Sequence, residues 1–490
     1  MTNPRIQKKQ ATNIVMITFW SQFAAFGLNS ILILFLTRPL FMHGLGYDQG
    51  KAYAFMGISQ ATGYLMPILG GYMADQVLGL RRSILFGSVF LVVDYLLIML
   101  SGLTITSFGD KLFLIAYAMI PAANSLLMGT ASAMVSRVYH NEDVKAKSAM
   151  TFYYMAINVG GLLATVIAPS LLESRYGPLS VLALTFVGKA IAATNFAARY
   201  SLYDPIVAAK DQHALSKRGW LHLIGYLTVL YGFTLFAYSH IVVASVVVSI
   251  GCVVGIIWFV IQSCLLSGVV RIKQLIAILL IVEAIIFFVV YNQMNTTLIL
   301  FAKYNSLTQW FGLSFSPAHY QLLNPLLIII LGMYLPRFYR RFPGFSIPYQ
   351  FASGTLLASA ALIIIGIAPA TPEGMIHGGF IALTYVLITL AELWVSAIGL
   401  SMIGLYCDVR MLGFAMGAWY LASSLSNILS GHIAQWVALP AHMISPLQSL
   451  SMYQRYYEHM GWVVFGIGVV MICVAYLLHQ TCHRREIKLA

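Results

Sequence analysis

Four ionisable side chains lie deep inside long apolar segments of this chain: Asp94, Lys189, Glu283 and Glu392. A charged group in hydrocarbon is costly, so such residues usually face a protein interior or water and mark the path of an ion or a polar solute. A buried carboxylate can bind a proton or the ammonium group of a ligand, and it can also pair with a lysine on another helix. The sequence therefore predicts its chemistry at these four positions.

The segments that must position these groups make up nearly the whole chain. Its 490 residues are 60 % hydrophobic and only 9 % charged, which excludes a soluble domain. The apolar residues form about fourteen segments of about 18 to 26 residues, each long enough to cross a bilayer as a helix. We therefore predict an all-α polytopic membrane protein with about fourteen transmembrane helices.

The net charge of +13 is unevenly distributed over the connections between these segments. Most lysines and arginines fall on the side of the N-terminus, which itself carries Arg5, Lys8 and Lys9. The other side has only Arg38, Lys51, Lys111, Arg175, Lys303 and Arg455. Because cytoplasmic loops retain positive charge, both termini are predicted to lie in the cytoplasm, with the protein in the cytoplasmic membrane. Topology thus explains the basic balance, and no nucleic-acid partner is predicted.

The spacing of the segments indicates a duplicated architecture. Residues 1-201 are predicted to form a six-helix bundle, 202-218 a polar cytoplasmic linker, 219-270 an inserted helix pair, and 271-490 a second six-helix bundle. Secondary transporters are often built in this way, with the solute bound near the membrane midplane between the two halves.

The loop after the second segment, residues 70–82, combines a double glycine, Asp75, a third glycine and the pair Arg81 and Arg82. Glycines let backbones approach closely, and an acid beside a helix end with two following arginines can latch neighbouring helix ends. This loop resembles the signature loop of the major facilitator superfamily. We therefore predict that Asp75, Arg81 and Arg82 form a conformational latch.

Residues 152–161, Phe-Tyr-Tyr-Met-Ala-Ile-Asn-Val-Gly-Gly, resemble the fifth-span signature of the proton-dependent oligopeptide transporters, a branch of that superfamily. Four further segments are similar to later helices of the same family: 291–298, 321–325, 391–400 and 411–420. The resemblance implies the major facilitator fold with two inserted helices, transport of peptides or peptide-like solutes, and no cofactor.

The first segment departs from this family. Members usually carry a Glu-x-x-Glu-Arg pattern there, whereas this chain has Thr18 and Ser21 at the acid positions and Gln22 at the arginine. Met128 similarly stands where the family has a lysine in the fourth span. All the usual carriers of charge in the N-terminal bundle are therefore neutral.

The positions that match the site for a peptide's amino terminus are retained. They are Asn158, Asn324 and Glu392. A carboxylate between two amides suits an ammonium group, whereas a bound carboxylate would lack charged partners and would lose solvation. We therefore predict a peptide-like solute that has an amine and needs no free carboxylate. Gln22, Tyr154, Gln293 and Trp394 are the other predicted substrate-binding residues.

Three acids are candidates for proton coupling: Glu392, Glu283 and Asp94. Asp94 also lies in the third span and Lys189 in the sixth, which are neighbours in this superfamily, so the two residues predict a structural ion pair. A carboxylate that binds either a proton or a cationic solute would support exchange or export as readily as symport.

Several alternatives stay open on the sequence alone. The solute could be a non-peptide metabolite such as a siderophore-like conjugate, and a non-transporting sensor could share this fold. An enzyme is not predicted, because there is no histidine-rich box, Ser-His-Asp set or phosphate loop, and a repeated filter-like ring typical of a channel is absent too. His479, Cys482 and His483 lie close together, but neither a metal nor a cofactor is predicted. The oligomeric state is left open.

Overall fold

The computed structural model describes residues 4–103, 107–139, 143–206, 211, 214–307, 309–310, 313–314, 316–342, 344–440, 445–485 and 487. Nearly all of them are helical, which confirms the predicted all-α class. Residues 207–210 and 212–213 of the predicted linker lie outside the described residues.

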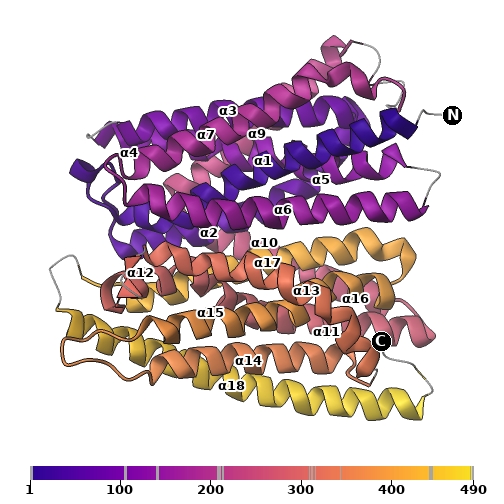
Figure 1. The fold of residues 1–490 in the computed structure, drawn as a ribbon. Coiled ribbons are helices and arrows are strands. Elements are labelled where there is room, and N and C mark those ends of the chain that lie inside the picture. The colour runs from indigo at the N-terminus through magenta and orange to yellow at the C-terminus, as the bar shows by residue number, and fades with distance from the viewer. Residues whose placement is uncertain are drawn as a thin grey trace. The chain divides into compact units, whose positions relative to one another are not determined.

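The first part of the chain forms long α-helices joined by short 3-10 or π-helical segments, which are labelled η (Figure 1). In order these are α1 (Pro4–Thr37), η1 (Leu40–Met42), α2 (Gln49–Met73), η2 (Ala74–Leu78), α3 (Leu80–Leu103), α4 (Ser107–Tyr117), α5 (Met119–Val138), α6 (Asp143–Leu172), α7 (Pro178–Ala198), η3 (Tyr200–Tyr203), α9 (Lys217–Ser239) and α10 (Ile241–Cys264).

The second part continues this pattern and adds one short hairpin. Its elements are α11 (Gly268–Tyr291), η4 (Asn292–Asn295), α12 (Thr297–Asn305), β1 (Gln309–Trp310), β2 (Leu313–Ser314), η5 (Pro317–Leu322), α13 (Leu323–Arg341), α14 (Ile347–Gly366), α15 (Gly378–Glu392), η6 (Leu393–Ala397), α16 (Ile398–Tyr406), η7 (Val409–Met411), α17 (Leu412–Ala434), η8 (Gln435–Val437) and α18 (Pro446–Arg484). The two strands pair antiparallel.

Twelve helical stretches of the described residues are long and apolar enough to cross a membrane. Some of them join two elements, such as α4 with α5 and α11 with α12. Helices α2 and α17, with 25 and 23 residues, are also long enough for a bilayer core of about 30 Å. Together these helices agree with the predicted fourteen spans.

Helix α1 begins well before its apolar stretch because its polar first turns find partners inside the protein. Gln7 Nε2 donates to the Val138 carbonyl over 3.2 Å, and Gln10 Nε2 donates to the Leu202 carbonyl over 2.7 Å. These bonds satisfy side-chain amide nitrogens that hydrocarbon could not, so the helix continues past the edge of the apolar segment.

The contacts divide the chain into two compact units. Unit 1 comprises residues 1–47 and 62–244, and unit 2 comprises residues 48–61 and 245–490. Helix α2 therefore contributes its first half to unit 2 and its second half to unit 1. The predicted domain boundaries stay a prediction.

In unit 1, α1 packs along α6 and α7, and α3 packs along α5, α7 and α4 (Figure 1). Small residues allow these helices to approach closely. A Cβ on Gly160 would lie 2.7 Å from the Phe19 carbonyl oxygen, so only glycine fits between α6 and α1 at this point. The double glycine of the fifth-span motif is thus part of the packing that positions Asn158 beside it in the chain.

In unit 2, α14 packs along α18 and α15, while α11 packs along α17.

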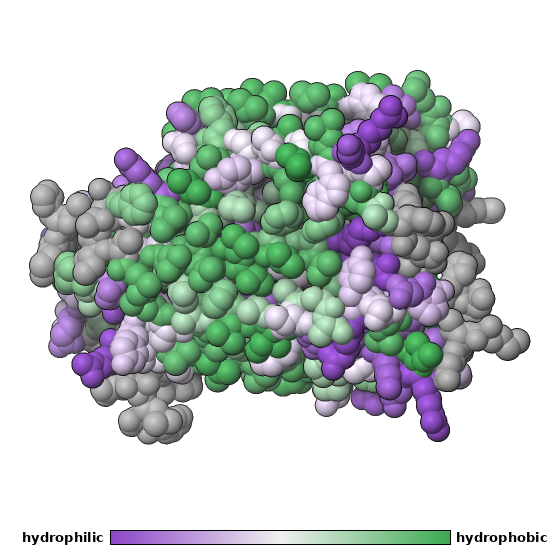
Figure 2. Space-filling view, turned by 90° about the horizontal axis from the view of Figure 1, so that it is seen from above, coloured by the Kyte–Doolittle hydropathy of each residue, from purple (hydrophilic) through white to green (hydrophobic). Residues whose placement is uncertain are grey.

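On the face shown in Figure 2, hydrophobic residues cover the middle and hydrophilic residues gather mainly towards the ends. That distribution suits helices that satisfy their own backbone hydrogen bonds in lipid.

Candidate functional site

The candidate functional site of unit 2 centres on Glu392, the last residue of α15. The Asn324 side-chain nitrogen, from α13, donates to Glu392 Oε2 over 2.6 Å and to Thr389 Oγ1 over 3.2 Å. The Tyr291 hydroxyl at the end of α11 also hydrogen-bonds to this carboxylate. The structure therefore brings together two of the three residues predicted to hold an amine, and it adds a hydroxyl from each of two helices.

The backbone around Glu392 is locally irregular. Helix α15 gives way directly to the π-helical turn η6 before α16 begins. The indole of Trp419 lies against Gly399, where any Cβ would collide with the ring. Such single π turns are rare and frequently occur at functional sites, because they change which side chains face inward.

Two hydrogen bonds of α15 residues hold the Thr389 side of this site in place. Thr389 Oγ1 donates to the Tyr385 carbonyl over 2.8 Å, and the fully buried Tyr385 hydroxyl donates to the Met294 carbonyl over 2.6 Å. The first bond lies within α15, and the second fixes α15 against η4. Sequence reasoning missed Thr389, although its place three residues before Glu392 on one helix face was a usable signal.

Several hydrogen-bond acceptors of this site are not used within the protein. An ionised carboxylate has about four lone-pair sites, and the side-chain carbonyl oxygen of Asn324 accepts no hydrogen bond from the described residues. An ammonium group has three donors and no acceptor. Glu392 and Asn324 can thus offer a cation both charge and hydrogen bonds, with Thr389 and Tyr291 holding their orientation.

Gln293 and Trp394 are bound to neighbouring protein groups. Gln293 is fully buried, and it donates to Ser430 over 2.9 Å and accepts from Thr297 and Tyr456 over 2.8 and 2.9 Å. Trp394, in η6, packs its ring 5.4 Å from that of Phe345. The predicted contacts of both residues with a solute stay predictions.

Glu283 lies on α11, apart from this group. It is half-buried, and none of the described residues forms a hydrogen bond or an ion pair with it. Its predicted role in coupling stays a prediction.

The predicted binding residues of unit 1 present few polar atoms. The Asn158 amide nitrogen donates to the Tyr154 carbonyl one turn earlier over 3.0 Å, while the Tyr154 ring is exposed. Gln22 is half-buried on α1, and Met128, at 45 % exposure, presents a thioether where the family has a lysine. None of these four side chains carries a charge, and their predicted contacts with a solute stay predictions.

Lys189 and Asp94 differ from the prediction. The Lys189 ammonium donates to the hydroxyl and the carbonyl oxygen of Ser21, both over 2.9 Å, and lies 5.0 Å from the centroid of the Tyr95 ring. Neither oxygen of Asp94 accepts a hydrogen bond from a described residue, although the two charges act on each other. The predicted direct ion pair is thus not formed in this structure, because Ser21 supplies two acceptors to the ammonium instead.

The predicted latch arginines bind acids that the prediction did not include. Arg81 pairs with Asp204 and donates to the Asp211 carbonyl over 2.7 Å, and the Arg82 guanidinium lies 3.4 Å from the Asp211 carboxylate. That carboxylate also accepts from the Arg81 backbone over 2.9 Å, so it caps the start of α3. Asp75 lies exposed in η2. A latching role for these residues stays a prediction.

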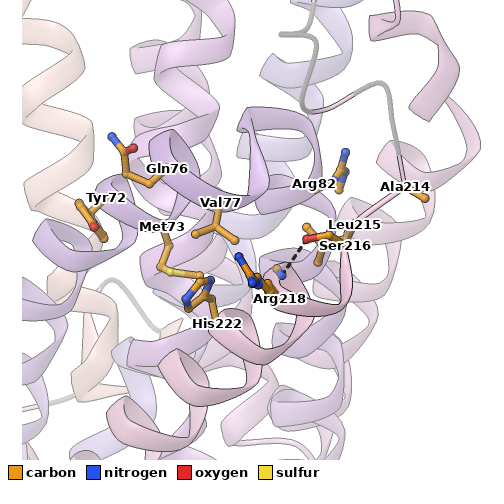
Figure 3. Close-up of a pocket in the computed structure, with 11 residues that line it drawn as sticks. Tyr72, Met73, Gln76, Val77, Arg82, Ala214, Leu215, Ser216, Arg218 and His222 are labelled. Carbon is orange, nitrogen blue, oxygen red and sulfur yellow. Dashed lines mark hydrogen bonds between the residues drawn. The ribbon is translucent and has the colours of Figure 1, made fainter.

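Gly79 allows Asp211 to reach α3. Its φ of +81° suits glycine, and a Cβ there would lie 2.5 Å from the Asp211 carboxyl carbon. Next to it a cavity of ≈ 600 Å³ opens between α2, η2 and the start of α9. Figure 3 shows the residues that line this cavity, among them Arg82, Arg218 and His222.

Comparisons with known proteins cover most of this chain and identify its family. Residues 81–454 match the family model described as the POT family. The chain is 31 % identical to dipeptide and tripeptide permease A of Chromobacterium violaceum over 484 residues, which cover 98 % of this chain and 95 % of the relative. It is 30 % identical to the permease of the same name from Salmonella typhimurium, with 97 % and 93 % coverage.

Solved structures agree. The fold matches the crystal structure of tetrameric PepTSo2 with a TM-score of 0.84 and 26 % identity, over 97 % of this chain and 99 % of that one. It also matches a bacterial homologue of the human drug peptide transporters PepT1 and PepT2 with a TM-score of 0.82, 25 % identity and the same coverage. On this evidence, the chain belongs to the POT family.

Proposed function

We propose that this protein is a secondary transporter of peptide-like solutes and that Glu392 binds their amine. Membership of the POT family and its permease relatives support peptide transport rather than an enzymatic reaction. The observation that carries the finer claim is the 2.6 Å hydrogen bond between Asn324 and Glu392, which orients a carboxylate beside a free amide carbonyl.

The same reasoning limits what the solute must contain. The first-span and fourth-span positions that would meet a peptide carboxylate are Gln22 and Met128, and neither carries a charge. Lys189 lies close to Ser21, but the residue is only 4 % exposed and its ammonium is already bound by Ser21. A solute carboxylate would have to give up its hydration without a charge-assisted partner, so the proposed solutes have an amine and no obligatory carboxylate.

Exchange of solutes in proteoliposomes tests this proposal. A free dipeptide, its C-terminally amidated form and its N-acetylated form would each compete with a labelled amidated dipeptide at equal pH on both sides. We expect the amidated form to compete at least as well as the free dipeptide, and the acetylated form to lose nearly all competition. If the free dipeptide clearly outcompetes its amide, the assignment of an amine-only site is wrong.

Glu392 also bears on the mode of transport. One carboxylate cannot hold a proton and an ammonium group at once, so the two compete, and Glu392 by itself supports exchange of protons for solute. Glu283 is the other acid of unit 2 that we propose as a coupling group. Protons as a partner, residence in the cytoplasmic membrane and cytoplasmic termini are parts of the proposal, the last two resting on the bias of lysine and arginine.

A further inference from the structure

A solute that is bound through its amine by ionised Glu392 can be carried together with a proton only if the proton binds elsewhere. In unit 1, Asp94 of α3 is a carboxylate within a membrane-spanning helix, and it is 0 % exposed. It belongs to none of the residues proposed to touch the solute. We propose that Asp94 is a proton-binding site that couples transport to the proton gradient. This inference rests on the proposed transport function.

The hydrogen bonding around Asp94 supports this role. Both carboxylate oxygens are buried, and no described residue donates to either of them. A buried polar group without a hydrogen-bond partner is energetically costly, and an ionised one costs more, so such groups are rare unless another species binds them. A proton on one oxygen removes the charge and most of this cost. In a purely structural ion pair, the cation would contact the carboxylate, as Arg82 contacts that of Asp211 in the same unit.

The charged and titratable groups around Asp94 can be named for each packed element. Lys189 of α7 is the cation that acts on it, and Tyr231 of α9 and Tyr95 of α3 are the nearby phenols, with Tyr117 of α4 beside Tyr95. Helix α4 also carries Asp110 and Lys111 near its start, α5 contributes only Arg137, in its last turn, and η2 contributes only Asp75. Arg81 and Arg82 lie at the start of α3, about 18 Å along the helix from Asp94. Lys189 is therefore the group with which a proton on Asp94 would compete.

Lys189 connects this site to α1. When Asp94 is protonated, nothing opposes the two bonds from the Lys189 ammonium to Ser21 that tie α7 to α1. When the proton leaves, the carboxylate attracts the ammonium, and its bonds to Ser21 are weakened. Proton occupancy thus biases a contact between two helices, which is what coupling requires of an ion-binding site.

Infrared difference spectroscopy tests proton binding directly and without solute. The wild-type protein in lipid vesicles should show a carboxylic-acid carbonyl band that disappears as the pH rises, and Asp94→Asn should lack this band. Asp94→Glu should keep a titrating band with a shifted midpoint, and Lys189→Met should move the midpoint to higher pH. Glu173→Gln, an exposed acid after α6, is the control and should match the wild type. Identical bands in wild type and Asp94→Asn would overturn the proposal.

Transport separates coupling from structure. Asp94→Asn should keep solute exchange at equal pH but lose the stimulation by an inward proton gradient, and the control Glu173→Gln should keep both. The proposal is wrong if Asp94→Asn keeps the stimulation, or if Asp94→Asn loses exchange and the double variant with Lys189→Met regains it. Absence of exchange in the wild type would contradict the proposed function, whereas the infrared result would still decide whether Asp94 binds a proton.

Discussion

The ammonium nitrogen of Lys189 lies 2.9 Å from both the hydroxyl and the carbonyl oxygen of Ser21, which joins α7 to the middle of α1. A cation from the sixth span thus meets the first span at one of the positions where related transporters carry an acid. This contact places a buried positive charge in a half of the protein whose usual charged residues are absent, and it makes Ser21 a residue of consequence for stability.

Ser21→Ala should lower the free energy of unfolding by about 1 to 3 kcal/mol, because it removes one of the two acceptors of a buried charged donor. Thermal unfolding in one detergent would measure the loss. Ser132→Ala is the matched control, since that exposed hydroxyl bonds only to a carbonyl of its own helix. An equal effect of the two substitutions would contradict the importance of the Lys189 contact.

Asp211→Ala should destabilise unit 1 by about 3 kcal/mol, because it removes a cap from α3 and leaves the buried Arg82 side chain with one acid fewer. Asp204→Ala removes the other acid near Arg81, but that carboxylate is 59 % exposed and should contribute within about 1 kcal/mol. The unfolding midpoints of the two variants provide the comparison. A larger loss for Asp204→Ala would show that the buried contact is not the important one.

Gln293→Ala should act on stability rather than on solute affinity. It leaves the hydroxyls of Ser430, Thr297 and Tyr456 without a shared partner, each at a cost of about 1 kcal/mol or more. Gln22→Ala, which removes a half-buried amide from α1, should leave the unfolding midpoint nearly unchanged. If Gln293→Ala unfolds like the wild type but weakens solute binding, Gln293 contacts the solute instead.

Thr389→Val should raise the KM for an amidated dipeptide several-fold, because Asn324 loses the hydroxyl that fixes its amide beside Glu392. Thr384→Val is the control on the same helix, since that hydroxyl faces Ala361 of α14. Its KM should equal that of the wild type. Equal KM values for all three proteins would show that Thr389 does not position the site.

The number and type of the helices follow from the sequence because lipid imposes a simple rule. A segment that crosses hydrocarbon must be apolar over about 20 residues, and this pattern is visible without any knowledge of packing. The start of α1 could not be predicted in the same way. Gln7 and Gln10 are helical because Val138 and Leu202, far along the chain, accept their hydrogen bonds.

In the candidate site too, residues within a recognisable sequence pattern could be predicted, whereas contacts between residues far apart in the chain could not. Asn324 and Glu392 could be predicted because each lies in a segment with a recognisable pattern, and the structure joins them directly. The contact of Lys189 with Ser21 spans 168 residues, and no spacing or periodicity indicates it. Asp94 was predicted to pair with Lys189 because opposite charges on neighbouring helices usually do, and a nearby pair of oxygen acceptors on α1 was enough to change that outcome.

The binding of an amine by Glu392 is the central claim, and uptake into proteoliposomes of a free dipeptide and its amidated twin, by the wild type and by Glu392→Gln, tests it most directly. Glu373→Gln, an exposed acid in the connection before α15, is the control. We predict that the wild type and Glu373→Gln take up the amidated form at least as fast as the free form, and that Glu392→Gln takes up neither. Undiminished uptake of the amidated dipeptide by Glu392→Gln would contradict the account.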